Sequence, residues 1–284
     1  MMIETKTYKG TVKDKTLLIL GAIHGNETCG TYAIHQLMKD IEGGELTLDK
    51  GTLILVPICN PKAYEQNKRY IDVNLNRVIG HHDNPTAYEH YLGAEVATLI
   101  DQADYVLDLH SVHGESVPFV FQDATTIEEE TFAQSMHLEN IIVGWPDIYK
   151  DDVEAASEIT TQTYAGSKNI PAITVECGTH GCPKADKLAV ECIYQALDFL
   201  NIARIPNLKA KPVFTKIVMD KYIRKEQEGV MEQHWIHMDK VAKGTILAHY
   251  ANGEILKAAD DCFILLPFHE AQIGDEWFYI GKAN

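Results

Sequence analysis

The sequence predicts an α/β protein with a central, mostly parallel sheet flanked by helices, followed by a small all-β domain. Up to residue 206, apolar runs of strand length alternate with segments of helical periodicity, and this alternation is typical of a parallel sheet. From Lys209 onward, short strand-like runs are separated by turn signals such as Asn252-Gly253, with no helical segment between them. We therefore expect two domains, residues 1–206 and residues 207–284.

The predicted strands and helices alternate along the chain. The first strand lies at 16–23 and is followed by a helix at 28–41 and a strand at 52–58. Residues 60–85 are polar with little periodicity, and a loop of that length inside a compact domain is usually functional or disordered. Helices follow at 87–101, 127–138, 153–164 and 183–202, and strands at 104–109, 118–121, 141–143 and 171–175. The second domain has expected strands at 213–219, 244–250 and 262–267.

Composition narrows the class of partner. The 284 residues carry a net charge of -16, which argues against nucleic acid and anionic membranes. The six cysteines lack disulfide spacing, so we expect free thiols in a reducing compartment. The amino terminus lacks the pattern of a signal peptide, and no apolar run approaches membrane-spanning length. These features predict a cytoplasmic protein that acts on a small molecule; its oligomeric state, homo-oligomer included, is left open.

His24 and Glu27 stand where the first strand passes into the first helix. Three residues apart on a first helical turn, an imidazole and a carboxylate face the same way. That arrangement suits a divalent metal such as zinc, which takes nitrogen and carboxylate-oxygen ligands. Two polar residues at the start of a helix are also typical of an amino-terminal cap, so the pair alone leaves both interpretations open.

Two later strands end in side chains that complete a ligand set. In open α/β sheets, ligands bind outside the carboxyl ends of the strands, so His110 and Glu176 are expected at the same edge as His24 and Glu27. Two histidines and a glutamate are the protein ligands of many catalytic zinc sites. Asp108 lies two residues before His110 and projects to the same face, where it could accept a hydrogen bond from a liganding imidazole.

Glu176 follows a buried strand and has two interpretations. A carboxylate there can take a proton from water activated by zinc and pass it to a leaving amine. A capping or ion-paired glutamate is the alternative, and position alone does not separate the two.

Five motifs occur in order along the chain: His24-x-x-Glu27, Asn60-Pro61, Arg69-x-x-Asp72-x-Asn74-Leu75-Asn76-Arg77, Asp108-Leu-His110-Ser and Glu176-x-Gly178. Together they resemble the aspartoacylase and succinylglutamate desuccinylase family, a branch of the zinc carboxypeptidase-like fold. The resemblance covers nearly the whole chain.

That resemblance implies a role for each residue in the motifs. One zinc ion per chain would be bound by His24, Glu27 and His110, and Glu176 would be the general acid/base. Arg69 would polarise the scissile carbonyl and stabilise the oxyanion. Asn76 and Arg77 would hold a substrate carboxylate, which a guanidinium can grip through two parallel hydrogen bonds.

One departure from the family pattern bears on the substrate. Family members that recognise two carboxylates tend to use a further arginine between the second histidine motif and the catalytic glutamate. Between His110 and Glu176 this chain has only Lys150 and Lys168 as cations besides histidine. Either a lysine takes the role of this arginine or the substrate carries only one carboxylate. The departure therefore argues against N-acetylaspartate and succinylglutamate as specific substrates, but not against the reaction class. His113 and His180 are further candidates to line the pocket.

Three functions fit the motifs. The first is a zinc amidohydrolase (deacylase) that cleaves the amide of an N-acyl amino acid or a similar small carboxylate-bearing compound. The second is a metallocarboxypeptidase, which shares the metal site; the small β domain favours the first, because in the resembling family it narrows access to the pocket. The third is a non-catalytic metal-dependent binding protein, which would be expected to lose Glu176 or Arg69 first, and both are present.

Overall fold

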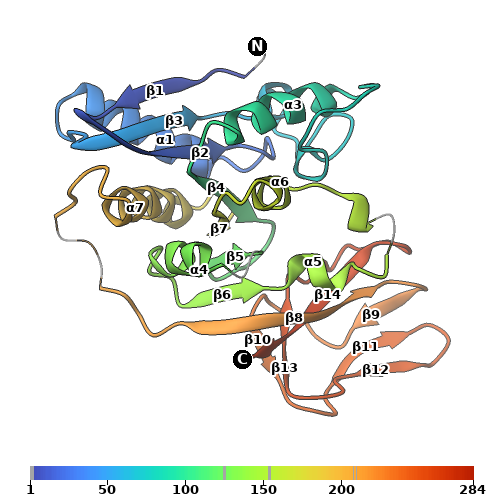
Figure 1. Cartoon of the computed structure of the whole chain (residues 1–284). Coiled ribbons are helices and arrows are strands. Elements are labelled where there is room, and N and C mark those ends of the chain that lie inside the picture. Colours follow the sequence, from blue (N-terminus) through green and yellow to red (C-terminus); the bar gives the residue numbers. More distant parts are fainter. Residues whose placement is uncertain (1–2, 124–125, 153–154, 207, 209) are drawn as a thin grey trace.

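A computed structural model describes residues 3–123, 126–152, 155–206, 208 and 210–284 (Figure 1). In these residues an 11-stranded sheet has the order β1-β3-β2-β4-β7-β5-β6-β8-β14-β13-β10, and a 3-stranded sheet has the order β12-β11-β9. The large sheet contains β1 (Lys6–Lys9), β2 (Val12–Gly21), β3 (Lys50–Val56), β4 (Tyr105–Val112), β5 (Phe119–Gln122), β6 (Asn140–Val143), β7 (Ala172–Thr179), β8 (Thr215–Arg224), β10 (Asp239–Val241), β13 (Cys262–Leu265) and β14 (Glu276–Ala283). The small sheet contains β9 (Gly229–Met231), β11 (Ile246–Tyr250) and β12 (Ile255–Lys257).

The helices alternate with the strands up to residue 199. They are α1 (Cys29–Glu42), α2 (Pro61–Glu65), α3 (Tyr88–Ile100), α4 (Ile127–Gln134), α5 (Trp145–Ile148), α6 (Thr161–Ser167) and α7 (Pro183–Phe199), with short 3-10 turns η1 (Leu75–Arg77) and η2 (Ala155–Ser157). None of the helices in the described residues is long and apolar enough to cross a membrane.

The middle of the large sheet is parallel, as the sequence predicts. Strands β3, β2, β4 and β7 run in one direction, and β5 reverses it. Helices cover both faces: Leu17 and Ile19 of β2 pack in one core with α1, α4 and α7, and Leu18 and Leu20 pack in the other with α3 and α6 (Figure 1). Because both faces are buried there, the stretch from Leu17 to Leu20 is continuously apolar instead of alternating. The predicted α/β class is confirmed.

Two strands extend further than the sequence pattern indicates. Strand β4 continues to Val112 and β7 to Thr179, so His110 and Glu176 lie inside strands, not after them. The reason is that the parallel ladder between β4 and β7 continues past the apolar run, with His110 opposite Glu176.

The predicted helix at 153–164 is wrong in its middle; residues 153 and 154 lie outside the described residues. Ile159 is extended, and its backbone N–H donates to the carbonyl of Arg77 at 2.9 Å. Helix α6 then begins after Thr160, whose side chain accepts a hydrogen bond from the backbone of Thr163 and caps the new helix.

The carboxyl-terminal strands extend the large sheet. Strand β8 pairs in parallel with β6, so hydrogen bonding crosses the predicted boundary at residue 206. One buried cluster joins Phe119 and Ile142 to Ile217 and Tyr279 from the later segment. A second cluster, centred on Trp277 and Phe278, forms the interior between the carboxyl-terminal strands. The two-domain division stays a prediction.

Candidate active site

His24 and Glu27 lie in the loop between β2 and α1. Helix α1 begins only at Cys29, so the expectation that they share a first helical turn is wrong. A tight turn brings them together instead: the Glu27 backbone N–H donates to the carbonyl of His24 at 3.0 Å. Gly25 permits this turn to pack closely, because a Cβ at that position would lie 2.2 Å from the backbone of Ala63. As a result, His24 Nδ1 lies 2.8 Å from Glu27 Oε1.

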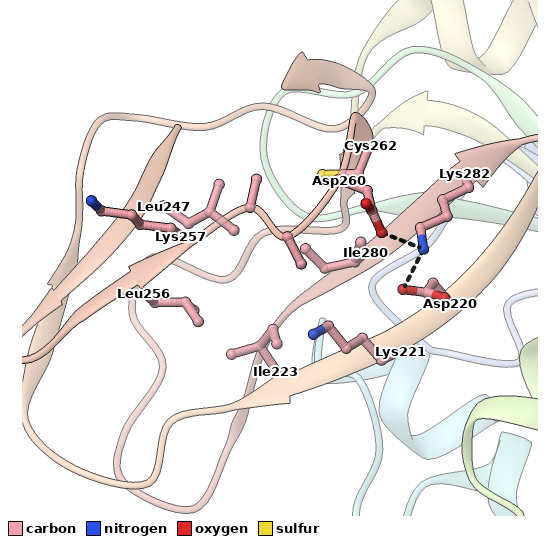
Figure 2. Close-up of a pocket in the computed structure, with 12 residues that line it drawn as sticks. Asp220, Lys221, Ile223, Leu247, Leu256, Lys257, Asp260, Cys262, Ile280 and Lys282 are labelled. Carbon is pink, nitrogen blue, oxygen red and sulfur yellow. Dashed lines mark hydrogen bonds and ion pairs between the residues drawn. The ribbon is translucent and has the colours of Figure 1, made fainter. Parts of the chain in front are cut away.

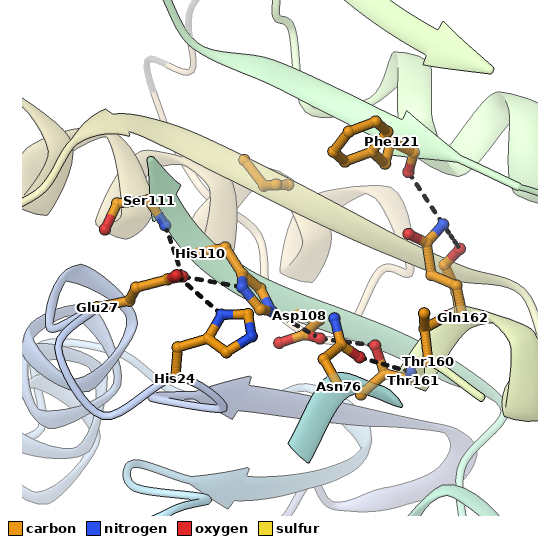
Figure 3. Close-up of polar contacts among 12 residues, drawn as sticks. His24, Glu27, Asn76, Asp108, His110, Ser111, Phe121, Thr160, Thr161 and Gln162 are labelled. Carbon is orange, nitrogen blue, oxygen red and sulfur yellow. Dashed lines mark hydrogen bonds and ion pairs between the residues drawn. The ribbon is translucent and has the colours of Figure 1, made fainter. Parts of the chain in front are cut away.

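His110 completes a buried three-residue cluster (Figure 3). Its Nδ1 lies 2.9 Å from Glu27 Oε2, so both imidazoles turn one nitrogen toward the same carboxylate. The candidate ligand atoms of His24, Glu27 and His110 all lie within 4.8 Å of one another. Among the described residues, this is the one group of three or more such side chains with that geometry.

The donor set fits zinc. Each imidazole turns its other nitrogen toward an oxygen: His24 Nε2 lies 3.0 Å from Asn74 Oδ1, and His110 Nε2 lies 3.0 Å from Asp108 Oδ2. Zinc-binding histidines commonly have a carboxylate or carbonyl oxygen near the second nitrogen. Among the described residues, His24 Nδ1 and His110 Nε2 are buried and have no hydrogen-bond partner of suitable geometry, so the contact of His110 with Asp108 is a close approach of the two groups. A metal ion would supply the partner that His24 Nδ1 lacks.

Asp108 is itself held in place. Its Oδ2 accepts a hydrogen bond of 2.6 Å from the hydroxyl of Thr161, the first residue of α6 (Figure 3). Asp108 and His110 lie two residues apart on β4 and therefore project to the same face of the sheet, as the sequence predicts.

The titratable groups in the cluster shift one another's pKa values. Burial opposes ionisation of Glu27, but its interactions and hydrogen bonds with the two neighbouring imidazoles, His24 and His110, outweigh burial and hold the pKa of Glu27 well below its usual range. Burial lowers the pKa of His24 to about 4. For His110 the nearby charges of Asp108 and Glu27 outweigh burial and raise its pKa. A cluster with one firmly ionised carboxylate and neutral His24 is suited to a divalent cation.

Glu176 faces this cluster from the neighbouring strand. It is the register partner of His110, and its side chain lines the same cavity. Its Oε2 is inaccessible to solvent and has no hydrogen-bond partner among the residues that the structure describes. Burial and the charge of Glu27 raise the pKa of Glu176 to about 8, within the range of a group that exchanges protons near neutral pH.

Arg69 reaches the cluster from the long polar loop. Its guanidinium Nη1 lies 2.8 Å from Glu27 Oε1, while 46% of its side chain stays accessible to solvent and therefore to a ligand. The loop is anchored by Glu89 of α3, which is completely buried. Glu89 accepts hydrogen bonds from the Asn60 side chain and from the backbone N–H groups of Ile71, Asp72 and Val73.

Asn76 and Arg77 follow in the same loop and line the same cavity. Asn76 Oδ1 accepts a hydrogen bond of 2.9 Å from the backbone N–H of Thr161. The amide NH₂ group of Asn76 therefore points away from Thr161 and can act as a donor. Arg77 Nε lies 2.5 Å from Glu158 Oε2, and its guanidinium lies 5.7 Å from the centroid of the Trp145 ring.

The cavity contains more residues than the motifs identify. It has a volume of about 140 Å³, enough for a small organic group. Residues in its wall without an assigned role in the sequence are Ser111, Val112, Phe121, Asp123, Trp145, Thr160, Gln162, Thr174 and Leu266. His113 lines the cavity, whereas His180 accepts or donates a hydrogen bond of 2.8 Å with the Ser111 hydroxyl. Only strand alternation could have identified Thr174, two residues before Glu176.

A second, smaller cavity lies among the carboxyl-terminal strands (Figure 2). Its polar contacts are ion pairs between Lys282 and two carboxylates, 3.4 Å to Asp220 and 3.2 Å to Asp260. Its remaining wall is mostly aliphatic. It offers no arrangement for acid–base chemistry comparable to that around Glu176.

Comparisons of the sequence and of the structure with known proteins agree on one family. A family model described as the succinylglutamate desuccinylase/aspartoacylase catalytic domain matches residues 13–191. Among curated relatives, the succinylglutamate desuccinylase of Yersinia pseudotuberculosis serotype O:3 (strain YPIII) is 36% identical over 77 residues, 27% of this chain and 21% of that protein. That of Yersinia pestis (strain Pestoides F) is 35% identical over 77 residues, with the same shares of both chains. The chain thus matches about a fifth of the length of these relatives.

Solved structures share the fold across the whole chain. A succinylglutamate desuccinylase/aspartoacylase from Rhodobacter sphaeroides has a TM-score of 0.80 at 16% identity, covering 99% of this chain and 89% of that one. The product-bound ectoine utilization protein EutE (DoeB) from Ruegeria pomeroyi has a TM-score of 0.79 at 20% identity, with the same coverage of both chains. At these identities the likeness shows the fold alone.

Proposed function

The chain belongs to the succinylglutamate desuccinylase/aspartoacylase family, and on this premise we propose that it is a zinc-dependent amidohydrolase. Its substrate would be an N-acyl amino acid or a similar small amide that bears a carboxylate. The observation that carries the proposal is the placement of Glu176 directly opposite His110, so that an unpartnered carboxyl oxygen faces the buried His24-Glu27-His110 cluster.

His24, Glu27 and His110 would hold one zinc ion per chain. Asn74 and Asp108 would orient the two imidazoles through their second nitrogens. When bound there, zinc supplies a Lewis acid for the amide carbonyl and makes water a stronger acid.

Glu176 would move the proton. As a carboxylate it accepts a proton from the attacking water, and as a carboxylic acid it donates that proton to the departing amine. Its raised pKa suits both halves of this cycle, because neither protonation state is strongly disfavoured near neutral pH. The products are a carboxylic acid and an amine.

Arg69 and two residues of the η1 turn, Asn76 and Arg77, would bind the substrate. Because the Arg69 guanidinium is partly exposed beside Glu27, it is placed to donate to the carbonyl oxygen as that oxygen gains negative charge. Asn76 and Arg77 would donate to the substrate carboxylate from the wall of the same cavity. The carboxyl-terminal segment contributes Leu266 to that wall, which supports its proposed part in shaping access.

Amine release tests this function. Zinc-loaded protein would be assayed on a panel of N-acyl amino acids and on short peptides, with Glu176→Gln as the matched inactive control. We expect turnover of small N-acyl amino acids that is lost in the variant. Progressive release of carboxyl-terminal residues from peptides instead would identify a metallocarboxypeptidase. Metal binding without turnover of either class would identify a binding protein.

A further inference from the structure

Asp123 is an acidic side chain in the cavity wall to which hydrolysis gives no role. It directly follows Gln122, the last residue of β5, which pairs with Ile173 on β7. Ile173 lies three residues before Glu176, and three steps along a strand span about 10 Å. Asp123 therefore lies toward the part of the cavity away from the proton-transferring glutamate.

One oxygen of the Asp123 carboxyl group has no hydrogen-bond partner among the described residues. This oxygen, Oδ1, is inaccessible to solvent. An enclosed carboxyl oxygen without a donor costs free energy, which a donor brought by a ligand would recover. Burial and the charge of Glu129 raise the pKa of Asp123 to about 7, and a cation beside the carboxyl would favour its ionised form.

The surrounding charges favour a cationic ligand group. Arg77 lines the cavity with Asp123, and its positive charge lowers the pKa of that carboxyl, against burial and the charge of Glu129. Its Nε is engaged by Glu158, and no ion pair joins Arg77 to Asp123 in the described residues. Asp147 on the neighbouring helix α5 adds a further negative charge to the surroundings of Asp123. A second substrate carboxylate in this part of the cavity would be repelled, whereas an ammonium group would be attracted.

We propose that Asp123 forms a subsite for a protonated amine, so that the preferred substrates are N-acyl amino acids with a free ammonium group in addition to the scissile amide. The inference rests on the amidohydrolase function. It names a substrate class: mono-acylated diamino acids, whose carboxylate would bind at Asn76 and Arg77 while the free ammonium binds at Asp123. It also accounts for the missing arginine between His110 and Glu176, because such a substrate has no second carboxylate for the enzyme to bind.

Two matched pairs of substrates test the subsite. Nα-acetyllysine and Nα-acetylnorleucine differ only in the side-chain ammonium, and Nε-acetyllysine and 6-acetamidohexanoate differ only in the α-ammonium. We expect wild type to prefer the ammonium-bearing member of at least one pair by about tenfold or more in kcat/KM, as a charge-assisted hydrogen bond provides. In Asp123→Asn, an isosteric change, the ratio should fall to near one. Asp147→Asn, which removes a nearby charge outside the cavity wall, should keep it.

Calorimetric titration of the zinc-loaded protein with lysine, norleucine and 6-aminohexanoate gives a readout independent of turnover. Lysine should bind about tenfold more tightly than at least one of the two analogues in wild type, and Asp123→Asn should remove the difference. Deacylation without any preference for the ammonium, or with a preference that survives in Asp123→Asn, overturns the subsite and leaves the amidohydrolase function standing. A binding preference that depends on Asp123 without hydrolysis of any amide keeps the subsite and rejects the amidohydrolase function.

Discussion

His110 and Glu176 are register partners on the adjacent parallel strands β4 and β7. A candidate metal ligand and the proposed proton carrier are therefore positioned by the same backbone hydrogen bonds that hold the centre of the sheet. Because side chains alternate along a strand, a slip of one residue would turn Glu176 to the opposite face and away from His110. The chemistry of the site thus depends on the register of the most buried part of the fold.

Glu176 should destabilise the metal-free protein as the pH rises. Its pKa in the folded chain, about 8, is above the ordinary glutamate value of 4.5. The unfolded chain therefore releases this proton first, and the stability that the group contributes at low pH is lost as the pH rises toward 8. Relative to wild type, metal-free Glu176→Gln should gain about 1–3 kcal/mol in unfolding free energy between pH 5 and pH 8.

Urea unfolding of both proteins at the two pH values measures this gain. Saturating zinc should reduce it, because a nearby cation favours the ionised glutamate. An equal difference in stability at pH 5 and pH 8 would show that Glu176 titrates normally.

Removing the Asp108 carboxylate should weaken metal binding. Asp108→Asn keeps the shape of the side chain but loses the charge beside His110 Nε2, and the affinity for zinc should fall about 10–100-fold. Thr161→Val should have a smaller effect in the same direction, because it removes only the hydrogen bond that orients Asp108. Thr98→Val, at an exposed position on α3 where the hydroxyl bonds only a carbonyl of its own helix, is the control. Competition with a chelator of known affinity measures all three, and unchanged zinc affinity in Asp108→Asn would exclude the orienting role.

Glu89 should control activity without touching the substrate. Its carboxylate accepts three backbone hydrogen bonds from the loop that carries Arg69, so Glu89→Gln replaces an acceptor of several donors with a group that has only one acceptor oxygen. We expect a loss of about 2–4 kcal/mol in unfolding free energy and a fall of about tenfold or more in kcat/KM. Glu95→Gln, elsewhere on α3, removes the same charge and is the control. Thermal melts and steady-state kinetics measure both effects. If Glu89→Gln is destabilised but keeps wild-type kinetics, the anchoring of the loop by Glu89 does not contribute to catalysis.

Buried His237 should make the folded chain sensitive to acid. Burial lowers its pKa to about 3, and its Nδ1 accepts a hydrogen bond of 3.0 Å from the backbone of Leu266, which lines the cavity. The unfolded chain binds a proton below about pH 6.5, well before the folded chain does, so stability falls as the pH falls. Between pH 7 and pH 5, wild type should lose about 2 kcal/mol more than His237→Gln. Denaturant unfolding at both pH values measures this, and parallel losses in the two proteins would contradict it.

The sequence predicts the fold well where a physical pattern is local. Apolar runs such as 16–23 specify buried strands because both faces of the sheet are covered. The extension of β4 and β7 was not predictable in this way, because His110 and Glu176 interrupt the apolar runs and pair only through the register of the ladder. The turn at His24-Gly25 likewise depends on close packing against Ala63, a contact across the fold.

The same distinction holds for the candidate site: local patterns could be predicted from the sequence, and contacts between distant segments could not. Ligand types and spacing pointed to His24, Glu27, His110 and Asp108, and the structure brings these four side chains together. Residues whose role depends on contacts between distant segments of the chain could not be identified from the sequence. Glu89 and Thr161 belong to helices, and their contacts with Ile71 and Asp108 arise only from packing of those helices on the sheet and loop.

The most direct test of the central claim compares amine release by wild type and Glu176→Gln at equal zinc occupancy, measured on one N-acyl amino acid that wild type hydrolyses. We expect one zinc ion per chain in both proteins and a rate about 10²–10⁴-fold lower in the variant, the usual contribution of general acid–base catalysis. Equal rates at equal occupancy would show that Glu176 does not move the proton. Loss of zinc from the variant would show that Glu176 belongs to the metal site, contradicting the assignment of His24, Glu27 and His110 as its complete set of protein ligands.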